Sequence, residues 1–436
     1  MTSRRNFIRT ASAAAAGSVL SLDALASARR IVAPSDKINV ALVGGNSMGW
    51  SDLDSFLKNP ETECVALCDI DQNVLDLRTD NIVKMGRPKP KLYNDHRKML
   101  EDKDIDVVIV GTPDHWHCMI FCDAMESGNH VYVEKPIGNS IAEINIMQKA
   151  VIKNGKMAQV GQWQRSQPHF VDAINFLKSG KLGRIRATKA WSFVDWKGPV
   201  PKVPDSPVPE GVDYTRWLGP APLRPFNRNR FHFTWRWYWE YGNGLMTDWG
   251  VHLIDYILYG MGVSIPDSVM AIGGKYAYPD DDMVTPDTMT AVYDFRYFTM
   301  TWEHTIGIGL GNWQRPHGMA YTGENGTLVL DRNGWEVFPE KQRMEAVPLQ
   351  KNVGSGLDLH VRNFLDCLQN NTPDKLHADV NIGRNVALVA QMGNIAYRTG
   401  EKVFWNNDKQ EFSSENANKL ITPEYHNGYT LPKYQG

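Results

Sequence analysis

The chain has 436 residues, 42% of them hydrophobic, which is enough for two domains that each bury a core. Its 47 Lys and Arg against 49 Asp and Glu give a formal net charge of -2, and no basic stripe is long enough to bind nucleic acid. The composition therefore excludes a single small module and argues against nucleic acid as a partner.

The first residues predict an export signal. Arg4 and Arg5 precede a weakly apolar run over residues 10–25, and Ala-x-Ala patterns follow up to Ala28. This is typical of a twin-arginine signal; a disordered basic N-terminus is the alternative. We expect the twin-arginine export machinery to carry the protein to the periplasm and residues 1–28 to be removed. The apolar run is too short to span a bilayer, so we expect no membrane span.

Residues 36–161 alternate short β-branched runs with amphipathic stretches. Strand-like runs occupy residues 38–43, 63–68, 107–110, 130–133 and 157–160, and helical patterns occupy 51–58, 72–84, 115–127 and 141–153. The alternation predicts an α/β domain with a doubly wound parallel sheet of the Rossmann type, which binds ligands at the carboxyl ends of its strands.

Residues 162–410 show a different pattern. A helical stretch at 169–179 is followed by a Pro-rich segment, 198–225, which predicts a surface or lid connection. Strand-like runs at 268–273, 289–295, 298–305 and 327–331 are joined by short turns, and helical patterns follow at 359–369 and 384–398. We expect an α+β domain with an open, mainly antiparallel sheet and a C-terminal tail, 411–436. Because such a sheet often pairs with another copy, we expect a homo-oligomer.

A glycine turn follows the first strand directly, as Gly44-Gly45-Asn46-Ser47-Met48-Gly49. Such a turn brings main-chain amides and a helix N-terminus to a pyrophosphate, so Gly44, Asn46, Met48 and Gly49 are candidate cofactor-binding residues. Asn46 replaces the middle glycine of G-x-G-x-x-G; asparagine tolerates unusual backbone angles. The motif is weak by itself.

Asp69 follows the second strand, where an acid would accept hydrogen bonds from the adenosine ribose hydroxyls. This position favours NAD over NADP. Alternatively, Asp69 opens a turn or caps the next helix, although Asp71 is the better cap.

Two later strand ends and one helix carry further motifs. They are Thr112-Pro113 with His117, Glu134-Lys135-Pro136, and the segment 244–255. In order and spacing they resemble the glucose–fructose oxidoreductase and inositol dehydrogenase family, often written Gfo/Idh/MocA, over essentially the whole mature chain. The resemblance implies an NAD(P)-dependent oxidoreductase, with Thr112, Pro113 and Glu134 at the cofactor. It places Lys135 between nicotinamide and substrate, where an ammonium group stabilises alkoxide charge; a solvated strand-end lysine is the alternative.

Histidine and cysteine spacing does not predict a metal site. His115 and His117 lie two residues apart at a helix start and point in different directions. We interpret His117 as a cofactor-pocket or capping residue. The five cysteines are expected to be buried thiols.

The segment 244–255 places Asp248 and His252 four residues apart on a predicted helix that begins at Thr247 or Asp248. A histidine can take the hydroxyl proton when an alcohol is oxidised. The resemblance implies that His252 is this base and Asp248 its orienter or the substrate anchor. A capping aspartate and a packed histidine are the alternative.

Fourteen tryptophans, many of them in the central third, suit stacking on sugar rings beside polar groups, although core packing accounts for about half. We assign Trp191, Arg236, Trp237 and Arg165 to the substrate, and Gln162 to the cofactor.

The function expected from these features is oxidation or reduction of a hydroxyl of a sugar, glycoside or cyclitol; one specific form is glycoside 3-dehydrogenation. An exported enzyme would keep its NAD tightly bound and recycle it. One alternative is an NAD-dependent glycoside hydrolase that works by transient oxidation and elimination, a branch whose pattern lacks the lysine kept here as Lys135. A non-catalytic sugar-binding protein is another.

Overall fold

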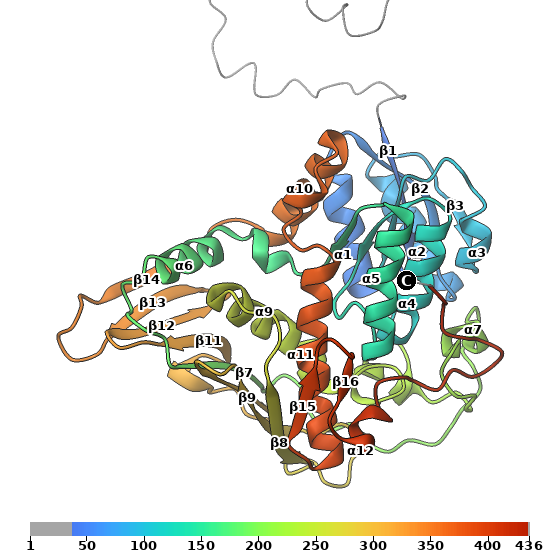
Figure 1. Cartoon of the computed structure of the whole chain (residues 1–436). Helices are drawn as coiled ribbons and strands as arrows, with labels where there is room; N and C mark the ends of the chain where they lie inside the picture. The colour runs from blue at the N-terminus through green and yellow to red at the C-terminus, as the bar shows by residue number, and fades with distance from the viewer. Residues whose placement is uncertain (1–36, 435–436) are drawn as a thin grey trace, which may run out of the picture. The chain divides into compact units, whose positions relative to one another are not determined.

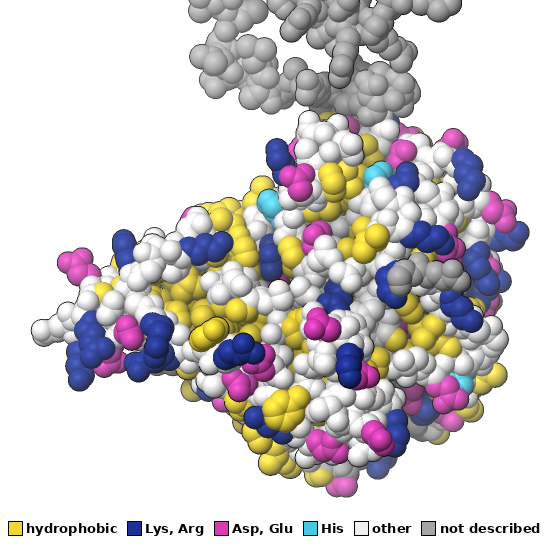
Figure 2. Space-filling model, viewed as in Figure 1, with side chains coloured by type: hydrophobic (Ala, Val, Ile, Leu, Met, Phe, Trp, Pro, Cys, Tyr) yellow, Lys and Arg dark blue, Asp and Glu magenta, His cyan; other side chains and the backbone are white. Residues whose placement is uncertain are grey.

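The computed structural model describes residues 37–434. The predicted twin-arginine signal, residues 1–28, lies outside this range. Between residues 37 and 434, no helix combines the length and the apolar character that crossing a membrane requires. On the face seen in Figure 2, acidic and basic side chains are interspersed.

The first part of the described chain forms a six-stranded parallel sheet in the order β3-β2-β1-β4-β5-β6. Its strands are β1 Ile38–Val43, β2 Thr62–Cys68, β3 Lys91–Tyr93, β4 Val107–Val110, β5 His130–Val133 and β6 Ala158–Val160. Its helices are α1 Ser47–Leu57, α2 Gln72–Lys84, α3 His96–Met99, α4 Asp114–Glu126 and α5 Ile141–Asn154. The predicted doubly wound sheet is confirmed. Among these strands and helices, only β3 and α3 were not predicted, because segments of three and four residues are too short to show a periodic pattern.

The second part forms a ten-stranded sheet in the order β14-β13-β12-β11-β7-β10-β9-β8-β15-β16. Its strands are β7 Ala187–Val194, β8 Ser268–Gly274, β9 Thr288–Asp294, β10 Thr299–Ile306, β11 His317–Thr322, β12 Gly326–Asp331, β13 Gly334–Pro339, β14 Val347–Lys351, β15 Val403–Asn406 and β16 Glu411–Phe412. All neighbours pair antiparallel except β7 and β10, which are parallel. The expected open, mainly antiparallel sheet is confirmed.

Helices join the two sheets into one structure (Figure 1). Helices α6 Pro168–Lys178 and α9 Gly250–Met261 pack on the larger sheet, and α11 Val380–Thr399 contacts both α5 and β8. One hydrophobic cluster accordingly includes Val131 and Met147 from the first sheet's layers and Leu253 and Val389 from the second. The remaining helices are α7 Tyr214–Leu218, α8 Gly244–Asp248, α10 Gly356–Asn370 and α12 Glu415–Asn418.

Two segments late in the chain, one within the expected domain 162–410 and one within the expected tail 411–436, pack on the layers of the first sheet. On α10, Phe364 packs edge-on against Phe56 and near Tyr132, in the core of the parallel sheet. Near the C-terminus, the Tyr425 hydroxyl donates to Glu143 on α5 at 2.6 Å. An apolar helix stripe does not specify which sheet it covers, so these returns are decided by tertiary packing.

The Pro-rich segment, predicted as a surface or lid connection, runs along the carboxyl end of β2. The amide of Asp213 donates to Ile70 at 2.8 Å, and the amide of Gln72 donates to Gly211 at 2.9 Å. These bonds place α7 and the residues after it beside the strand ends where ligands of such sheets bind.

Candidate active site

A pocket of about 360 Å³ lies at the carboxyl ends of β1, β2, β4 and β5 and is closed by residues of the second part of the chain. Many predicted site residues meet there: Gly44, Asn46, Met48, Asp69, Thr112, Pro113, His117, Glu134, Lys135, Arg236, Asp248 and His252. The structure therefore brings these predicted residues together around one pocket, and their roles there stay predictions.

The glycine turn packs closely against the loop after β4. Gly44 has φ +88°, and a Cβ there would meet the backbone of Gly111 at 2.8 Å. Gly49 does not line the pocket; it packs against Gly44 and Gly111, so that α1 approaches the sheet closely. The tolerance of asparagine for unusual backbone angles is not used at Asn46. Asn46 is extended and caps α1 by accepting from the amide of Ser47, and Ser47 takes the positive φ of 43°.

Asp69 lies in the pocket, and Asp71 is the helix cap. The Asp69 carboxylate accepts from the amides of Gly45 at 2.8 Å and Asp71 at 3.0 Å, while Asp71 caps α2 by accepting from Asn73. Burial raises the pKa of Asp69, and the two amide bonds oppose this shift. Asp69 therefore braces the glycine turn as well as facing the pocket.

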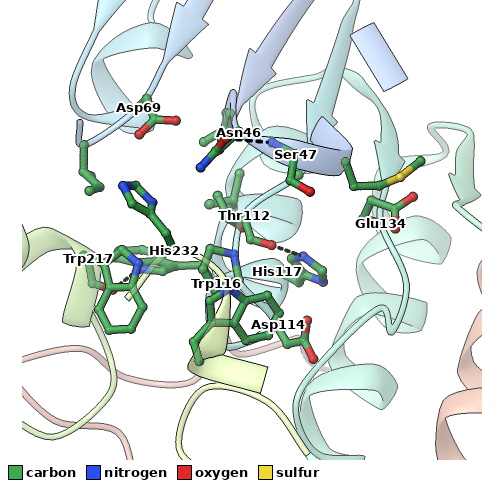
Figure 3. Close-up of a pocket in the computed structure, with 18 of the residues that line it drawn as sticks. Asn46, Ser47, Asp69, Thr112, Asp114, Trp116, His117, Glu134, Trp217 and His232 are labelled. Atoms are coloured by element: carbon green, nitrogen blue, oxygen red, sulfur yellow. Dashed lines mark hydrogen bonds between the residues drawn. The ribbon is translucent and has the colours of Figure 1, made fainter. Parts of the chain in front are cut away.

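Two residues that we did not predict close this end of the pocket. Figure 3 shows Trp217 and His232 across from Asp69 and Asn46. His232 Nε2 lies 3.0 Å from Asp71 Oδ2, and the Trp217 carbonyl accepts from Trp116 Nε1 at 2.9 Å. The sequence shows only an aromatic segment here, because its contacts are to residues more than 100 positions away.

His115 and His117 bind different carbonyl groups. His115 Nε2 lies 2.9 Å from the Trp217 oxygen. His117 lies between Thr112 O, 2.8 Å from Nε2, and Pro136 O, 2.7 Å from Nδ1, and thereby links the loops after β4 and β5. Burial lowers the pKa of both rings to about 4. Within residues 37–434, no cluster of His, Cys, Asp and Glu could hold a metal ion.

Lys135 and Asp248 form an ion pair between the two parts of the chain. Lys135 Nζ donates to Asp248 Oδ1 at 3.0 Å and to its main-chain oxygen at 2.9 Å, and Arg236 Nε lies 3.4 Å from Oδ1. Burial acts to raise the pKa of Asp248, but the charges of Lys135 and Arg236 lower it below its ordinary value. Of the two expected roles of Asp248, orienting His252 is not met, since its partners are Lys135 and Arg236; the role of substrate anchor stays a prediction.

The helix that carries these residues also differs from the expected one. It begins at Gly244 rather than at Thr247 or Asp248, ends at Asp248 as α8, and resumes as α9 at Gly250. Gly244 has φ +67°, a conformation that suits glycine and starts α8 earlier than the polar residues suggested. Asp248 and His252 still line one pocket.

His252 is buried, and its Nδ1 has no hydrogen-bond partner. Burial, together with the charges of Lys135 and Arg332, lowers the pKa of His252 well below its ordinary value. The ring is therefore neutral at neutral pH and can accept a proton.

Arg332 and Trp163 also line the pocket and were not predicted. The guanidinium carbon of Arg332 lies 5.0 Å from the Trp163 ring centroid and 4.7 Å from that of Trp249. Burial lowers the pKa of Arg332 to about 10. In the sequence, Arg332 stands in an Asp-Arg-Asn-Gly turn, a pattern that indicates an exposed loop.

Besides Gly49, four assigned residues lie outside the pocket. Trp191 is fully buried and donates from Nε1 to the Arg315 carbonyl. It packs with Ala320 and Val329, while Ala190 packs with the main core, because neighbouring strand residues point to opposite faces. Trp237 is fully buried as well. The assignment of both tryptophans to the substrate was wrong because a core tryptophan and a pocket tryptophan have the same local pattern.

Arg165 and Gln162 were also misplaced. Arg165 Nε donates to both carboxylate oxygens of Asp255, at 2.9 and 2.8 Å, in a buried ion pair. Gln162 is buried at the start of a short 3₁₀ turn. Neither lines the pocket, although Trp163 between them does.

The Gfo/Idh/MocA model described as "Oxidoreductase family, NAD-binding Rossmann fold" matches residues 38–162. The one described as "Oxidoreductase family, C-terminal alpha/beta domain" matches residues 182–431.

Two curated relatives are a glycosyl hydrolase family 109 protein of Shewanella baltica and an alpha-N-acetylgalactosaminidase of Shewanella oneidensis. They are 38% and 35% identical over 204 residues, covering 42% of this chain and 44% of each relative. The match thus spans less than half the length of these relatives.

Similar solved structures share the fold. An aldose-aldose oxidoreductase from Caulobacter crescentus, complexed with glycerol, has a TM-score of 0.63 and 18% identity, covering 84% of this chain and 99% of the other. A levoglucosan dehydrogenase in complex with NADH and levoglucosan has a TM-score of 0.63 and 19% identity over the same shares.

Proposed function

This chain belongs to the Gfo/Idh/MocA oxidoreductase family and carries its NAD-binding Rossmann domain, and we propose that it oxidises or reduces a hydroxyl of a sugar, glycoside or cyclitol with tightly held NAD. The observation that carries the proposal is the meeting of Lys135 and His252 in the pocket that begins at the glycine turn. They come from different parts of the chain. A cation and a neutral base are the two groups that alcohol oxidation needs.

The pocket residues fit NAD. The first amides of α1 have no partner within the helix, which suits a pyrophosphate, and Gly44 lets the turn before them pack against the main chain of Gly111. Asp69 would receive the ribose hydroxyls and would repel the extra phosphate of NADP. The buried Thr112 Oγ1 and Glu134 Oε1 lack hydrogen-bond partners, which suits polar groups of the cofactor. When bound, NAD would accept or return the hydride of the substrate carbon.

The chain's own residues would manage the proton and the charge. His252 takes the hydroxyl proton, because its ring is neutral, lines the pocket and makes no hydrogen bond to any residue between 37 and 434. Lys135 stabilises the negative charge that develops on the substrate oxygen. Asp248 holds Lys135 in position through two hydrogen bonds and leaves one N–H of the ammonium group for the substrate.

The test begins with the purified protein as isolated. Its absorbance and fluorescence report bound reduced nicotinamide, and a panel of sugars, glycosides and cyclitols is then added. A change in the nicotinamide signal without bond cleavage supports the proposal. Absence of both bound nicotinamide and turnover contradicts it and leaves a non-catalytic sugar-binding protein.

The second candidate is glycoside hydrolysis by transient oxidation, elimination and re-reduction. The names of the Shewanella relatives favour it, whereas the retained Lys135 argues for the dehydrogenase. The same panel separates the two, since a hydrolase releases free aglycone and shows no net change in nicotinamide. In deuterated water it would also incorporate deuterium at the carbon that is deprotonated during elimination.

Export is part of the proposal. The twin-arginine pattern supports transport of the folded protein to the periplasm with NAD already bound, because free NAD is scarce there. Fractionation of cells that express the full chain tests this, with Arg4→Lys and Arg5→Lys together as the variant. Loss of the periplasmic form in the variant is expected.

We also propose a homo-oligomer formed through the larger sheet. Along β8, β9 and β15, the side chains of Met270, Ile272, Val292 and Phe404 are exposed, between 39% and 74%. Apolar side chains on an open sheet favour a second copy as the covering partner. Light scattering should give a particle mass that is a multiple of the chain mass. The substitution Ile272→Lys should reduce that particle mass.

A further inference from the structure

Arg332 differs from the other pocket cations in lacking a carboxylate partner. Lys135 and Arg236 pair with Asp248, and Arg97 and Arg216 pair with Asp95. Arg332 makes no hydrogen bond and no ion pair to any residue between 37 and 434, and its Nε is fully buried. Its guanidinium group lies over the rings of Trp163 and Trp249, and the Asp248 carboxylate acts on its charge without a hydrogen bond or an ion pair to it.

This arrangement leaves a charge without a hydrogen-bond acceptor. Tryptophan rings attract a cation through their faces. They accept no hydrogen bonds from the five N–H groups that lie in the plane of the guanidinium. With a pKa of about 10, Arg332 stays charged at neutral pH. A partly buried arginine without a carboxylate is costly, and an anionic ligand relieves that cost.

The position of Arg332 indicates that this anionic ligand is the substrate and not the cofactor. Its charge acts on His252, and it shares Trp249 with the segment that carries Asp248 and His252. The glycine turn, where the pyrophosphate of NAD fits, belongs to the other part of the chain. The anion is therefore expected on the molecule whose hydroxyl reaches His252.

We propose that the substrate is a sugar that carries an oxyanion, such as the carboxylate of a uronic acid, and that Arg332 binds this group. The proposal rests on the proposed function and names its substrate class. The planar guanidinium edge matches a carboxylate with two parallel hydrogen bonds, and a sulfate on a sugar presents related chemistry.

Calorimetry on the NADH-loaded protein tests binding apart from turnover. Hexuronates are compared with their parent hexoses, and sugar 6-sulfates form the second arm. We expect the wild-type protein to prefer an acidic sugar by at least about 10-fold, and Arg332→Gln to reduce this preference by about 10- to 100-fold. Arg332→Lys should restore part of it. Preference for sulfates over carboxylates would assign the oxyanion to a sulfate ester.

Arg186→Gln is the matched control, because Arg186 is exposed beside β7 and its side chain forms no ion pair or hydrogen bond. It should retain the full preference. Equal binding of acidic and neutral sugars by the wild type, binding of no acidic sugar, or an unchanged preference in Arg332→Gln would each overturn the proposal.

A role limited to His252 gives a different result. If Arg332 only lowers the pKa of His252, Arg332→Gln shifts the pH profile equally for acidic and neutral sugars and leaves their ratio unchanged. The experiments also distinguish the anion site from the proposed redox function. Turnover of neutral sugars without a preference for acidic sugars refutes the anion site alone. Binding of acids without any nicotinamide signal refutes the proposed redox function alone.

Discussion

The ammonium group of Lys135 donates to both the carboxylate and the main-chain carbonyl of Asp248, at 3.0 and 2.9 Å, across 113 positions of the chain. The two hydrogen bonds join the loop after β5 to the end of α8. They bring a cation of the first part of the chain beside the helix that carries His252, so the candidate site depends on the contact between both parts.

Removal of Lys135 tests the electrostatic role. Lys135→Met should lower kcat by about 100- to 1000-fold, the usual loss when one group that stabilises an oxyanion is removed. NADH affinity should change by less than about 3-fold, as measured by fluorescence titration. Lys189→Met is the control, since Lys189 forms a comparable ion pair with Glu303 outside the pocket, at 2.8 Å. Equal losses in both variants would indicate general destabilisation.

His252→Asn removes the proposed proton acceptor and should lower kcat by about 100-fold or more. Because burial and nearby cations lower the pKa of His252, its neutral form persists below pH 6.5. The acid limb of the wild-type rate profile should therefore lie below that pH and be absent from the residual activity of the variant. Near-normal activity in the variant would reject this assignment.

Asp69→Ala should weaken NAD binding by about 10-fold, because bonds to a charged acceptor contribute about 1.5–3 kcal/mol. The affinity for NADP should fall much less, since the extra phosphate of NADP no longer meets a carboxylate in the variant. Titrations with NADH and NADPH measure both. Asp76→Ala, at an exposed residue of α2 outside the pocket, is the control. A melting curve is needed as well, because Asp69 also holds the amide of Gly45.

Glu143 provides a pH test of the C-terminal contact. Burial raises its pKa to about 7, although Tyr425 and the Asn139 amide donate to it. The folded protein thus holds a proton that the unfolded chain releases above about pH 4.5. This contribution to the free energy of unfolding is complete below pH 4.5 and is lost as the pH rises through 7.

Glu143→Gln should remove that dependence. In urea unfolding, the variant should gain stability relative to the wild type by roughly 1 kcal/mol per pH unit between pH 4.5 and 7. Parallel curves for the two proteins would refute the assignment. Glu126→Gln, with an exposed side chain on α4, should follow the wild type.

The parallel sheet and the cofactor end of the pocket could be read from the sequence. Strands β1, β4 and β5 are short apolar runs, and the residues after them must lie at one edge of the sheet. Gly44 and Asp69 were predicted from this rule and the glycine motif, whereas the place of Lys135 was implied by the resemblance to the family. Asp248 and His252 followed from their spacing together with the family motifs.

Long-range packing decided the rest. Trp191 and Trp163 look alike in the sequence, yet one lies in the core and the other in the pocket. Arg165 binds Asp255 in a buried pair, whereas Arg332 has no carboxylate partner, and neither outcome follows from adjacent residues. The partner of a side chain depends on which distant segment covers it.

The sequence by itself determined the two sheet types, the strand ends that meet at the cofactor, and the candidate proton acceptor, because these follow from periodicity and from local motifs. Only the tertiary structure decided that Asp248 holds Lys135 instead of His252, that the Pro-rich segment and residues near the C-terminus close the pocket, and that Arg332 is left for a ligand. Burial and pairing are set where segments distant in the chain meet, and no local pattern encodes which segments those are.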